Sequence, residues 1–133
     1  QIFSEPEKMM ILIAEDNPLM RKMLRSLVED LATEIIECAD GAAALRLYEE
    51  HRPAWVLMDV SMRPVDGLSA TRAIVARFQS ARIVIITEHN DAETRRCAFE
   101  AGASEFFGKD YLLPLRSLIK NAGDSEIFGR EII

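Results

Sequence analysis

Cysteine is scarce in this sequence of 133 residues, which has only Cys38 and Cys97. The two lie far apart, with no Cys-x-x-Cys pair and no neighbouring pair of histidines, so the pattern argues against a zinc site and against a disulfide framework. We expect both thiols to be reduced and buried in a chain that works in the cytoplasm.

Long apolar runs and clusters of one charge are also missing. No apolar stretch approaches the roughly 20 residues that a membrane-spanning helix needs, and the first eight residues lack the basic start and apolar stretch of a signal peptide. The chain has 16 basic and 22 acidic residues, a formal net charge of -6, and no segment dense in Lys and Arg that could follow a phosphate backbone. We therefore expect no membrane contact and no direct nucleic-acid binding.

The hydrophobic residues, 49% of the chain, are gathered in short runs separated by segments of helical period. The runs predict five strands, at 9–14, 34–39, 54–59, 82–87 and 104–108. They are apolar nearly throughout, which is typical of strands covered on both faces in a parallel sheet. Strict alternation of strand and helix therefore predicts a doubly wound α/β fold, a five-stranded parallel sheet flanked by five helices, since five strands are too few for an eight-stranded barrel.

Capping residues predict where the helices between the strands begin. Asn17 with Pro18 starts the first helix, whose buried face would hold Met20, Met23, Leu24, Leu27, Val28 and Leu31. The later helices are predicted to start at Asp40, Asp66, Asn90 (a capping box with Glu93) and Pro114.

No break in composition indicates a second domain. We expect an N-terminal extension at 1–8, one domain at 9–122, and a tail at 123–133 that is a frayed end, an extra turn of helix or the start of a truncated linker.

Polar residues follow the predicted strands where each strand ends. Glu15 and Asp16 follow the first strand, Asp59 ends the third, Thr87 ends the fourth, and Lys109 follows the fifth. Parallel strands bring their carboxyl ends to one edge of the sheet, which is where ligands bind in open α/β folds. Each residue alone would be an ordinary cap or loop residue, but together they predict one site.

The chemistry of this site follows from its charge. Close carboxylates repel by roughly 4 kcal/mol per pair at an effective dielectric constant of about 20, so a cation must offset them. Mg²⁺ prefers such oxygen ligands together with a phosphoryl oxygen. Lys109 and Thr87 could contact further phosphoryl oxygens, and Asp59 could act as the nucleophile that forms an acyl phosphate.

At this point the sequence resembles the response-regulator receiver domains of two-component signalling, over about residues 9 to 121. The resemblance is carried by AEDNP, LMDVSMRPVDG, IIT and EAGASEFFGKD, which match in order. It implies strand order 2-1-3-4-5, and Mg²⁺ on Asp16, Asp59 and the Ser61 backbone carbonyl, with Glu15 held through water. It also implies that Asp59 accepts phosphate from a histidine kinase or phosphotransfer protein, with slow self-dephosphorylation.

The resemblance also assigns residues around the site. It places a rotating switch aromatic, coupled to Thr87, at Phe106, and it places Ser61 and His89 beside the path of the hydrolytic water. Glu88 departs from the family, in which a small residue usually follows the threonine. An anion there would oppose entry of a phosphoryl donor.

Partners are expected on the face formed by the fourth helix, fifth strand and fifth helix, where Arg95, Arg96 and Phe99 are candidate contacts. The resemblance favours a downstream effector there, such as a fused DNA-binding domain outside these residues, or homodimerisation. Other hypotheses stay open. One is a constitutive interaction module that is never phosphorylated. Another is a Mg²⁺-dependent phosphohydrolase, although such an enzyme would normally have an acid where Ser61 stands. A third is a flavin- or nucleotide-binding module, and the lack of a glycine-rich loop counts against it.

Overall fold

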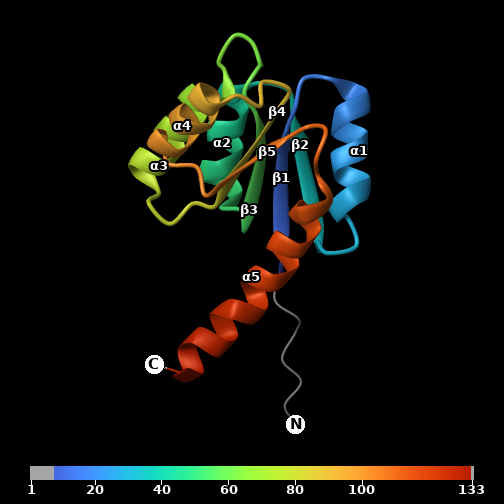
Figure 1. Ribbon diagram of the computed structural model, residues 1–133, viewed down its shortest axis with the longest axis vertical. Coiled ribbons are helices and arrows are strands. Elements are labelled where there is room, and N and C mark those ends of the chain that lie inside the picture. Colours follow the sequence, from blue (N-terminus) through green and yellow to red (C-terminus); the bar gives the residue numbers. More distant parts are fainter. Residues whose placement is uncertain (1–7, 133) are drawn as a thin grey trace.

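The computed structural model describes residues 8–132, with side chains described as far as residue 122. In this part of the chain, five strands alternate with five helices (Figure 1). The strands are β1 (Met10–Ala14), β2 (Glu34–Cys38), β3 (Trp55–Asp59), β4 (Ile83–Thr87) and β5 (Glu105–Gly108). The helices are α1 (Pro18–Val28), α2 (Gly41–His51), α3 (Gly67–Arg77), α4 (Ala92–Glu100) and α5 (Leu113–Ile132).

The strands form one parallel sheet in the order β2-β1-β3-β4-β5, which confirms both the predicted fold class and the order implied by the resemblance. Every residue of β3 and β4 is buried, as expected for strands covered on both faces. β2 differs, because its Glu34 and Glu37 are exposed at the edge of the sheet. An edge strand has only one neighbour and so tolerates charged side chains.

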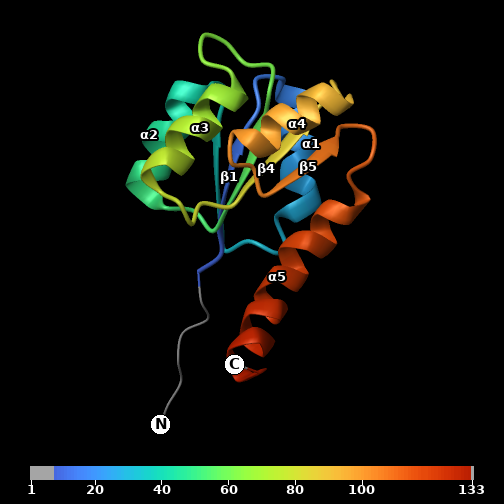
Figure 2. The same ribbon diagram turned by 60° about the vertical axis from the view of Figure 1, so that its left-hand side comes forward.

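Two apolar cores lie on the two faces of the sheet. Leu24 and Val28 of α1 and Leu115 and Ile119 of α5 pack on one face. Helices α2, α3 and α4 cover the other, with residues such as Ile74 in its core. Figure 1 shows α1 on one side of the sheet and α2, α3 and α4 on the other, and Figure 2 shows the same arrangement turned so that α4 lies in front.

Three of the five predicted helix starts are confirmed, because Asn17, Asp40 and Asp66 cap α1, α2 and α3. The prediction of Asn90 as a cap is wrong. Asp91 is the cap of α4, because its carboxylate accepts hydrogen bonds from both the backbone amide (2.7 Å) and the hydroxyl (3.0 Å) of Thr94. α5 begins one residue before Pro114.

Two expectations about burial are also wrong. Met23, placed on the buried face of the first helix, is 47% exposed, because the core side of α1 is centred on Leu24 and Val28. Cys38 and Cys97 are free thiols, but both are only partly buried. Cys38 lies on the edge strand. Burial, together with the charge of the neighbouring Asp40, raises the pKa of its thiol to about 11, and the thiol donates a weak hydrogen bond of 3.7 Å to the Asp40 carbonyl.

Gly67, the first residue of α3, fixes the helix against the end of β3. A Cβ atom at this position would collide with the backbone carbonyl of Asp59, so only glycine allows so close an approach. The Gly67 amide also donates a hydrogen bond of 2.9 Å to the carbonyl of Val60. The loop between β3 and α3 is thereby closed directly beside Asp59.

The helix α5 continues as far as Ile132, past the lower edge of the sheet (Figure 1). The segment 123–132 of the expected tail is therefore helical, whereas most of the expected N-terminal extension, residues 1–7, lies outside the described residues. Among the described helices, none is both long enough and apolar enough to cross a membrane.

Candidate functional site

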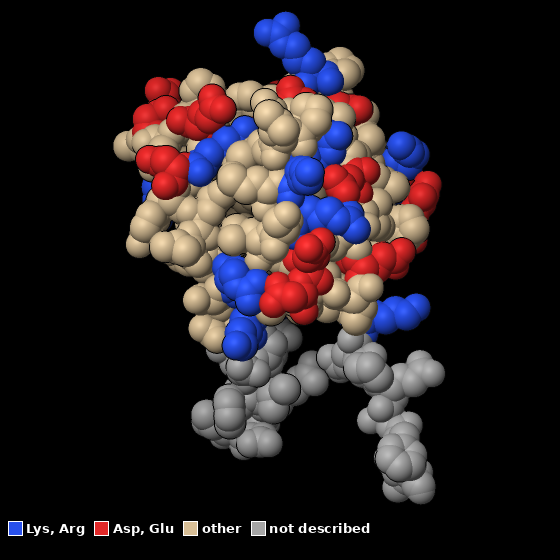
Figure 3. All heavy atoms as spheres, turned by 90° about the vertical axis from the view of Figure 1, so that its right-hand side faces the viewer, with Lys and Arg blue, Asp and Glu red and all other residues tan. Residues whose placement is uncertain are grey.

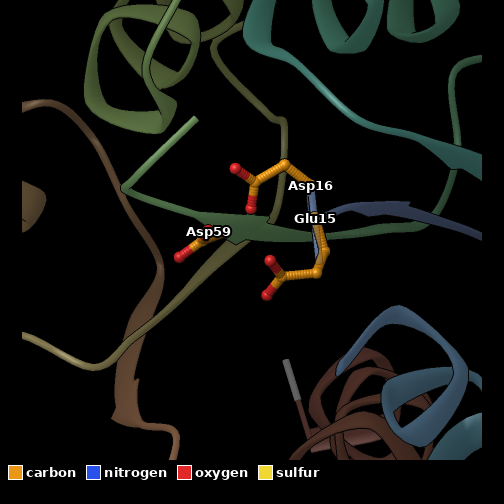
Figure 4. A group of neighbouring side chains, drawn as sticks. All are labelled: Glu15, Asp16 and Asp59. Carbon is orange, nitrogen blue, oxygen red and sulfur yellow. The ribbon is translucent and has the colours of Figure 1, made fainter. Parts of the chain in front are cut away.

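Three acids meet at the carboxyl edge of the sheet, as the sequence predicts. Glu15 and Asp16 directly follow β1, and Asp59 is the last residue of the neighbouring β3. One carboxylate oxygen from each lies within 4.8 Å of the others. Figure 4 shows the three side chains directed toward a common space beyond the strand ends.

The acids differ in burial. Glu15 is completely buried and Asp59 is 3% exposed, whereas Asp16 is exposed. The ammonium nitrogen of Lys109 lies 2.9 Å from Oε1 of Glu15 and 3.4 Å from Oδ1 of Asp59. Both of these oxygens are buried, and neither accepts a well-directed hydrogen bond. Lys109 therefore offsets their charge without satisfying their hydrogen-bonding capacity.

Burial controls the ionisation of these groups. It raises the pKa of Glu15 to about 7, against the opposing effects of Lys109 and of the Asn17 amide, which donates to Oε2 of Glu15 at 3.1 Å. Burial likewise raises the pKa of Asp59. For Lys109 burial acts in the lowering direction, but contact with Glu15 and Asp59 outweighs it and raises the pKa of the ammonium.

The donor set fits a hard divalent cation. Three carboxylates lie together, Lys109 contacts only two of them, and the buried Oδ1 of Asp59 lacks a good hydrogen-bond donor. A small open cavity of about 220 Å³ lies over them, lined by Asp16, Asn17, Asp59, Ser61, Glu88 and Lys109. Oxygen ligands beside a cavity open to water are the environment in which Mg²⁺ is bound, with part of its coordination left to water or phosphate.

Thr87 lies beside this group at the end of β4. It is fully buried, and its hydroxyl oxygen accepts a hydrogen bond of 3.0 Å from the backbone amide of His89. Its carbonyl accepts a 2.8 Å hydrogen bond from the backbone amide of Lys109. The chain positions of Thr87 and Lys109 are thus tied to each other across β4 and β5.

The rim holds the remaining predicted residues. Ser61 and Glu88 are exposed and line the cavity, so Glu88 adds a fourth carboxylate at its mouth. His89 is exposed, and its backbone supports Thr87.

The predicted switch aromatic, Phe106, is 3% exposed and packs in the core beneath α2, α3 and α4, whereas Phe107 packs on the opposite core. The guanidinium of Arg95 lies 5.7 Å from the centre of the Phe106 ring and 5.2 Å from that of Phe99. The structure therefore shows Phe106 in a buried orientation, under an arginine of α4.

Sequence reasoning missed two contributors to the site. Asn17 was assigned only as a helix cap, yet it also lines the cavity and hydrogen-bonds Glu15. Arg21 has the sequence pattern of an exposed helical residue, but it donates a hydrogen bond of 2.8 Å to the carbonyl of Glu15. No local pattern signals that contact, because it depends on where α1 packs relative to β1.

The parallel sheet in the order β2-β1-β3-β4-β5 and the acidic pocket at its carboxyl edge together define a receiver type of α/β domain, and comparison with known proteins agrees. The family model described as "Response regulator receiver domain" matches residues 11–120, and the chain belongs to this family. Receiver domains are generally regulatory rather than catalytic, and they partner histidine kinases.

Similarity to individual proteins extends over most of the chain. The transcriptional regulatory protein YhcZ of Bacillus subtilis is 38% identical over 104 residues, which are 77% of this chain and 49% of that protein. The chemotaxis protein CheY of Halobacterium salinarum is 31% identical, with 78% of this chain and 87% of that protein covered. The chain thus spans about half the length of the regulator and nearly all of the chemotaxis protein.

Solved structures show the same fold. A LuxR-family two-component response regulator from Aurantimonas has a TM-score of 0.76 at 31% identity, with 86% of this chain and 87% of that chain covered. The receiver domain of the histidine kinase CKI1 from Arabidopsis thaliana, solved with Mg²⁺ and BeF₃⁻, has a TM-score of 0.73 at 26% identity, with 87% and 90% covered.

Glu15 makes the stability of the metal-free protein depend on pH. Its carboxyl ionises at its ordinary pKa of 4.5 when unfolded but keeps its proton to about 7 when folded. The stabilisation from this proton is complete below the unfolded pKa and is lost as pH rises through the folded one. We expect the free energy of unfolding in EDTA to fall by on the order of 2 kcal/mol between about pH 5 and pH 8.

Denaturant titration at both pH values measures this fall, and Glu15→Gln should reduce it to the part that comes from Asp59, whose pKa burial also raises. Glu93→Gln, at an exposed acid in the first turn of α4, is the matched control and should leave it intact. An equal fall in Glu15→Gln would contradict the assignment of the titrating group.

Proposed function

We propose that this protein is a phosphorylation-controlled signalling switch in which Asp59 accepts a phosphoryl group from a histidine kinase or phosphotransfer protein. The observation that carries the proposal is the position of Asp59. It lies at the floor of an open cavity, with Lys109 beside it and two further acids within reach. A nucleophilic carboxylate next to a fixed cation and a cation site is the arrangement that phosphoryl transfer requires.

In the proposed transfer, an Asp59 carboxylate oxygen attacks the phosphorus of a phosphohistidine. The new O–P bond forms as the N–P bond breaks, and the imidazole leaves with the bonding electron pair and takes up a proton. Lys109 contacts one phosphoryl oxygen, exchanging one anionic partner for another. The Thr87 hydroxyl, whose oxygen accepts a hydrogen bond from the His89 amide, donates a hydrogen bond to a second phosphoryl oxygen.

Mg²⁺ would be held by Asp16, Asp59 and the Ser61 carbonyl, with Glu15 acting through water. When bound, it would offset the negative charge that accumulates as the phosphoryl group approaches three carboxylates. The similar CKI1 receiver solved with Mg²⁺ and BeF₃⁻ supports this choice of metal.

The conformational change of the switch is proposed to be transmitted to the face formed by α4, β5 and α5. A groove of about 660 Å³ lies on this face. It is lined by Arg95 of α4, Phe106 of β5 and Leu118 of α5, together with Tyr111 of the loop between β5 and α5. Movement of Thr87 toward a phosphoryl group would vacate space for Phe106 to change its rotamer, and Arg95 would follow because it stacks on that ring. A downstream effector or a second copy of the chain would bind there.

The output partner is proposed to be a DNA-binding domain on the same polypeptide or a separate effector. Similarity to a transcriptional regulator and to a LuxR-family regulator supports the first, and similarity to CheY supports the second.

A second candidate function has one observation in its favour. Glu88 puts a negative charge at the mouth of the cavity, which would suit a constitutive interaction module that is never phosphorylated. A phosphohydrolase is less well supported, because the residue that would supply its general acid is Ser61.

Incubation with Mg²⁺ and acetyl phosphate, followed by intact-protein mass spectrometry, tests the acceptor. We expect the mass of one phosphoryl group to be added, stable in acid and labile in base, because an acyl phosphate has that reactivity. Asp59→Asn should lose the adduct, whereas Asp16→Asn should retain the acceptor and react more slowly. No adduct in the native protein would favour the constitutive module, and rapid turnover would favour the hydrolase.

Glu88→Gln should speed phosphorylation by acetyl phosphate. Removing one like charge from the mouth of the cavity is worth about 1 kcal/mol, or about fivefold in rate. Stopped-flow or quenched time courses measure the rate, and Glu93→Gln, which lies outside the cavity lining, is the control. An unchanged rate would show that Glu88 does not oppose the donor, and an adduct formed only in Glu88→Gln would assign the constitutive role to the native chain.

Ser61 and His89 are proposed to set the lifetime of the phosphorylated form by narrowing the path of the hydrolytic water. Both are exposed at the rim, and Ser61 lines the cavity itself. Replacing both with alanine should shorten the half-life of the adduct severalfold, measured after removal of acetyl phosphate. An unchanged half-life would contradict a role of Ser61 and His89 in setting the lifetime.

A further inference from the structure

Arg21 connects the surface of α1 to the backbone of the acidic pair. One guanidinium nitrogen donates a hydrogen bond of 2.8 Å to the carbonyl oxygen of Glu15, while the Nε atom lies 3.2 Å from Oε1 of Glu37 on β2. The Arg21 side chain is 26% exposed, so these contacts are partly shielded from water. A charged donor on a backbone carbonyl makes a stronger hydrogen bond than a neutral donor does.

The contact is placed where it controls the direction of the chain. The Glu15 carbonyl belongs to the peptide group that joins Glu15 to Asp16. The Glu15 amide is held by the carbonyl of Cys38 at 3.0 Å. With its amide bound to β2 and its carbonyl bound to Arg21, the backbone of Glu15 is fixed on both sides, and the orientation of Asp16 follows from it.

The guanidinium is itself held in place. The Glu37 carboxylate forms ion pairs with both Arg21 and Arg25, which lies one turn later on α1. In the second pair a guanidinium nitrogen of Arg25 lies 2.6 Å from Oε2 of Glu37. The side of the molecule that carries α1 shows basic and acidic side chains intermingled, in keeping with such pairing (Figure 3). Arg21 and Arg25 thus share one carboxylate. Of these two arginines, Arg21 is the one that donates a hydrogen bond to the Glu15 carbonyl in the described structure.

We propose that Arg21 is a positioning residue for the metal-binding acids. By fixing the Glu15–Asp16 peptide, it preorganises both carboxylates to receive a divalent cation without touching that cation. The inference rests on the Mg²⁺ site of the proposed function and deepens it. Residues that orient metal ligands in this way typically change metal affinity by about 10- to 100-fold when they are removed.

The direction in which Mg²⁺ affinity changes when Arg21 is removed distinguishes a positioning role from a purely electrostatic one. Arg21 is a cation near a cation site, so removing it would strengthen Mg²⁺ binding if charge alone mattered. Removing a positioning residue weakens binding. Arg25 supplies the matched control, because its replacement takes the same charge from the same Glu37 and leaves the Glu15 carbonyl bond in place.

The experiment is calorimetric titration of Mg²⁺ into the metal-free native protein, Arg21→Met and Arg25→Met, at the same pH and ionic strength. We expect the Mg²⁺ dissociation constant of Arg21→Met to rise about tenfold, and that of Arg25→Met to stay the same or fall. Arg21→Lys keeps a cationic donor and should recover part of the loss. Circular dichroism checks that each variant is folded, and Arg21→Gln replaces Arg21→Met with the same expectation if the latter is not.

Equal affinities in Arg21→Met and Arg25→Met, or tighter binding in Arg21→Met, would overturn the positioning role. Failure of the native protein to bind Mg²⁺ would instead overturn the proposed metal site, and the inference with it. The two failures are distinguishable because the first requires a measurable native affinity.

Discussion

The contact of one ammonium group with two buried carboxylates is the interaction on which this site depends. Lys109 reaches Glu15 and Asp59 from the loop that follows β5, and without it these two buried acids would lie side by side with no lysine to offset their charge. Removing one partner of such a group costs several kcal/mol, because the remaining charge is left desolvated. The compensation is incomplete, since three acids cluster there and Lys109 contacts only two of them. That imbalance is what makes the site ready for a second cation.

The sheet supplies the geometry for this interaction. β1 and β3 are adjacent, so their last residues bring Glu15, Asp16 and Asp59 together, and β4 and β5 add Thr87 and Lys109 along the same edge. The central strands β3 and β4 are buried on both faces, which leaves them little freedom to slide. A rigid sheet with chemistry confined to its loops allows the side chains at one edge to change while the framework does not.

Much of this arrangement could be predicted from the residues. Each strand was located to within a residue or so, because an apolar run ending in a polar residue is a strong local signal. The failures concern features set by distant contacts. Asn90 and Asp91 are equally good caps by type, and the path of the loop after β4 decided between them. The exposure of Met23 and the contact of Arg21 with the Glu15 carbonyl depend on how α1 rotates against the sheet, which periodicity defines only to within a residue.

The close approach of Gly67 to the carbonyl of Asp59 limits the backbone movement that the proposed phosphorylation could cause. Helix α3 begins in direct contact with the backbone of the proposed acceptor, so that backbone cannot shift without displacing a whole helix from the core. The backbone of Asp59 is therefore held in a fixed position. The signal of the proposed switch would therefore pass through side chains and the loops after β4 and β5 rather than through movement of α3.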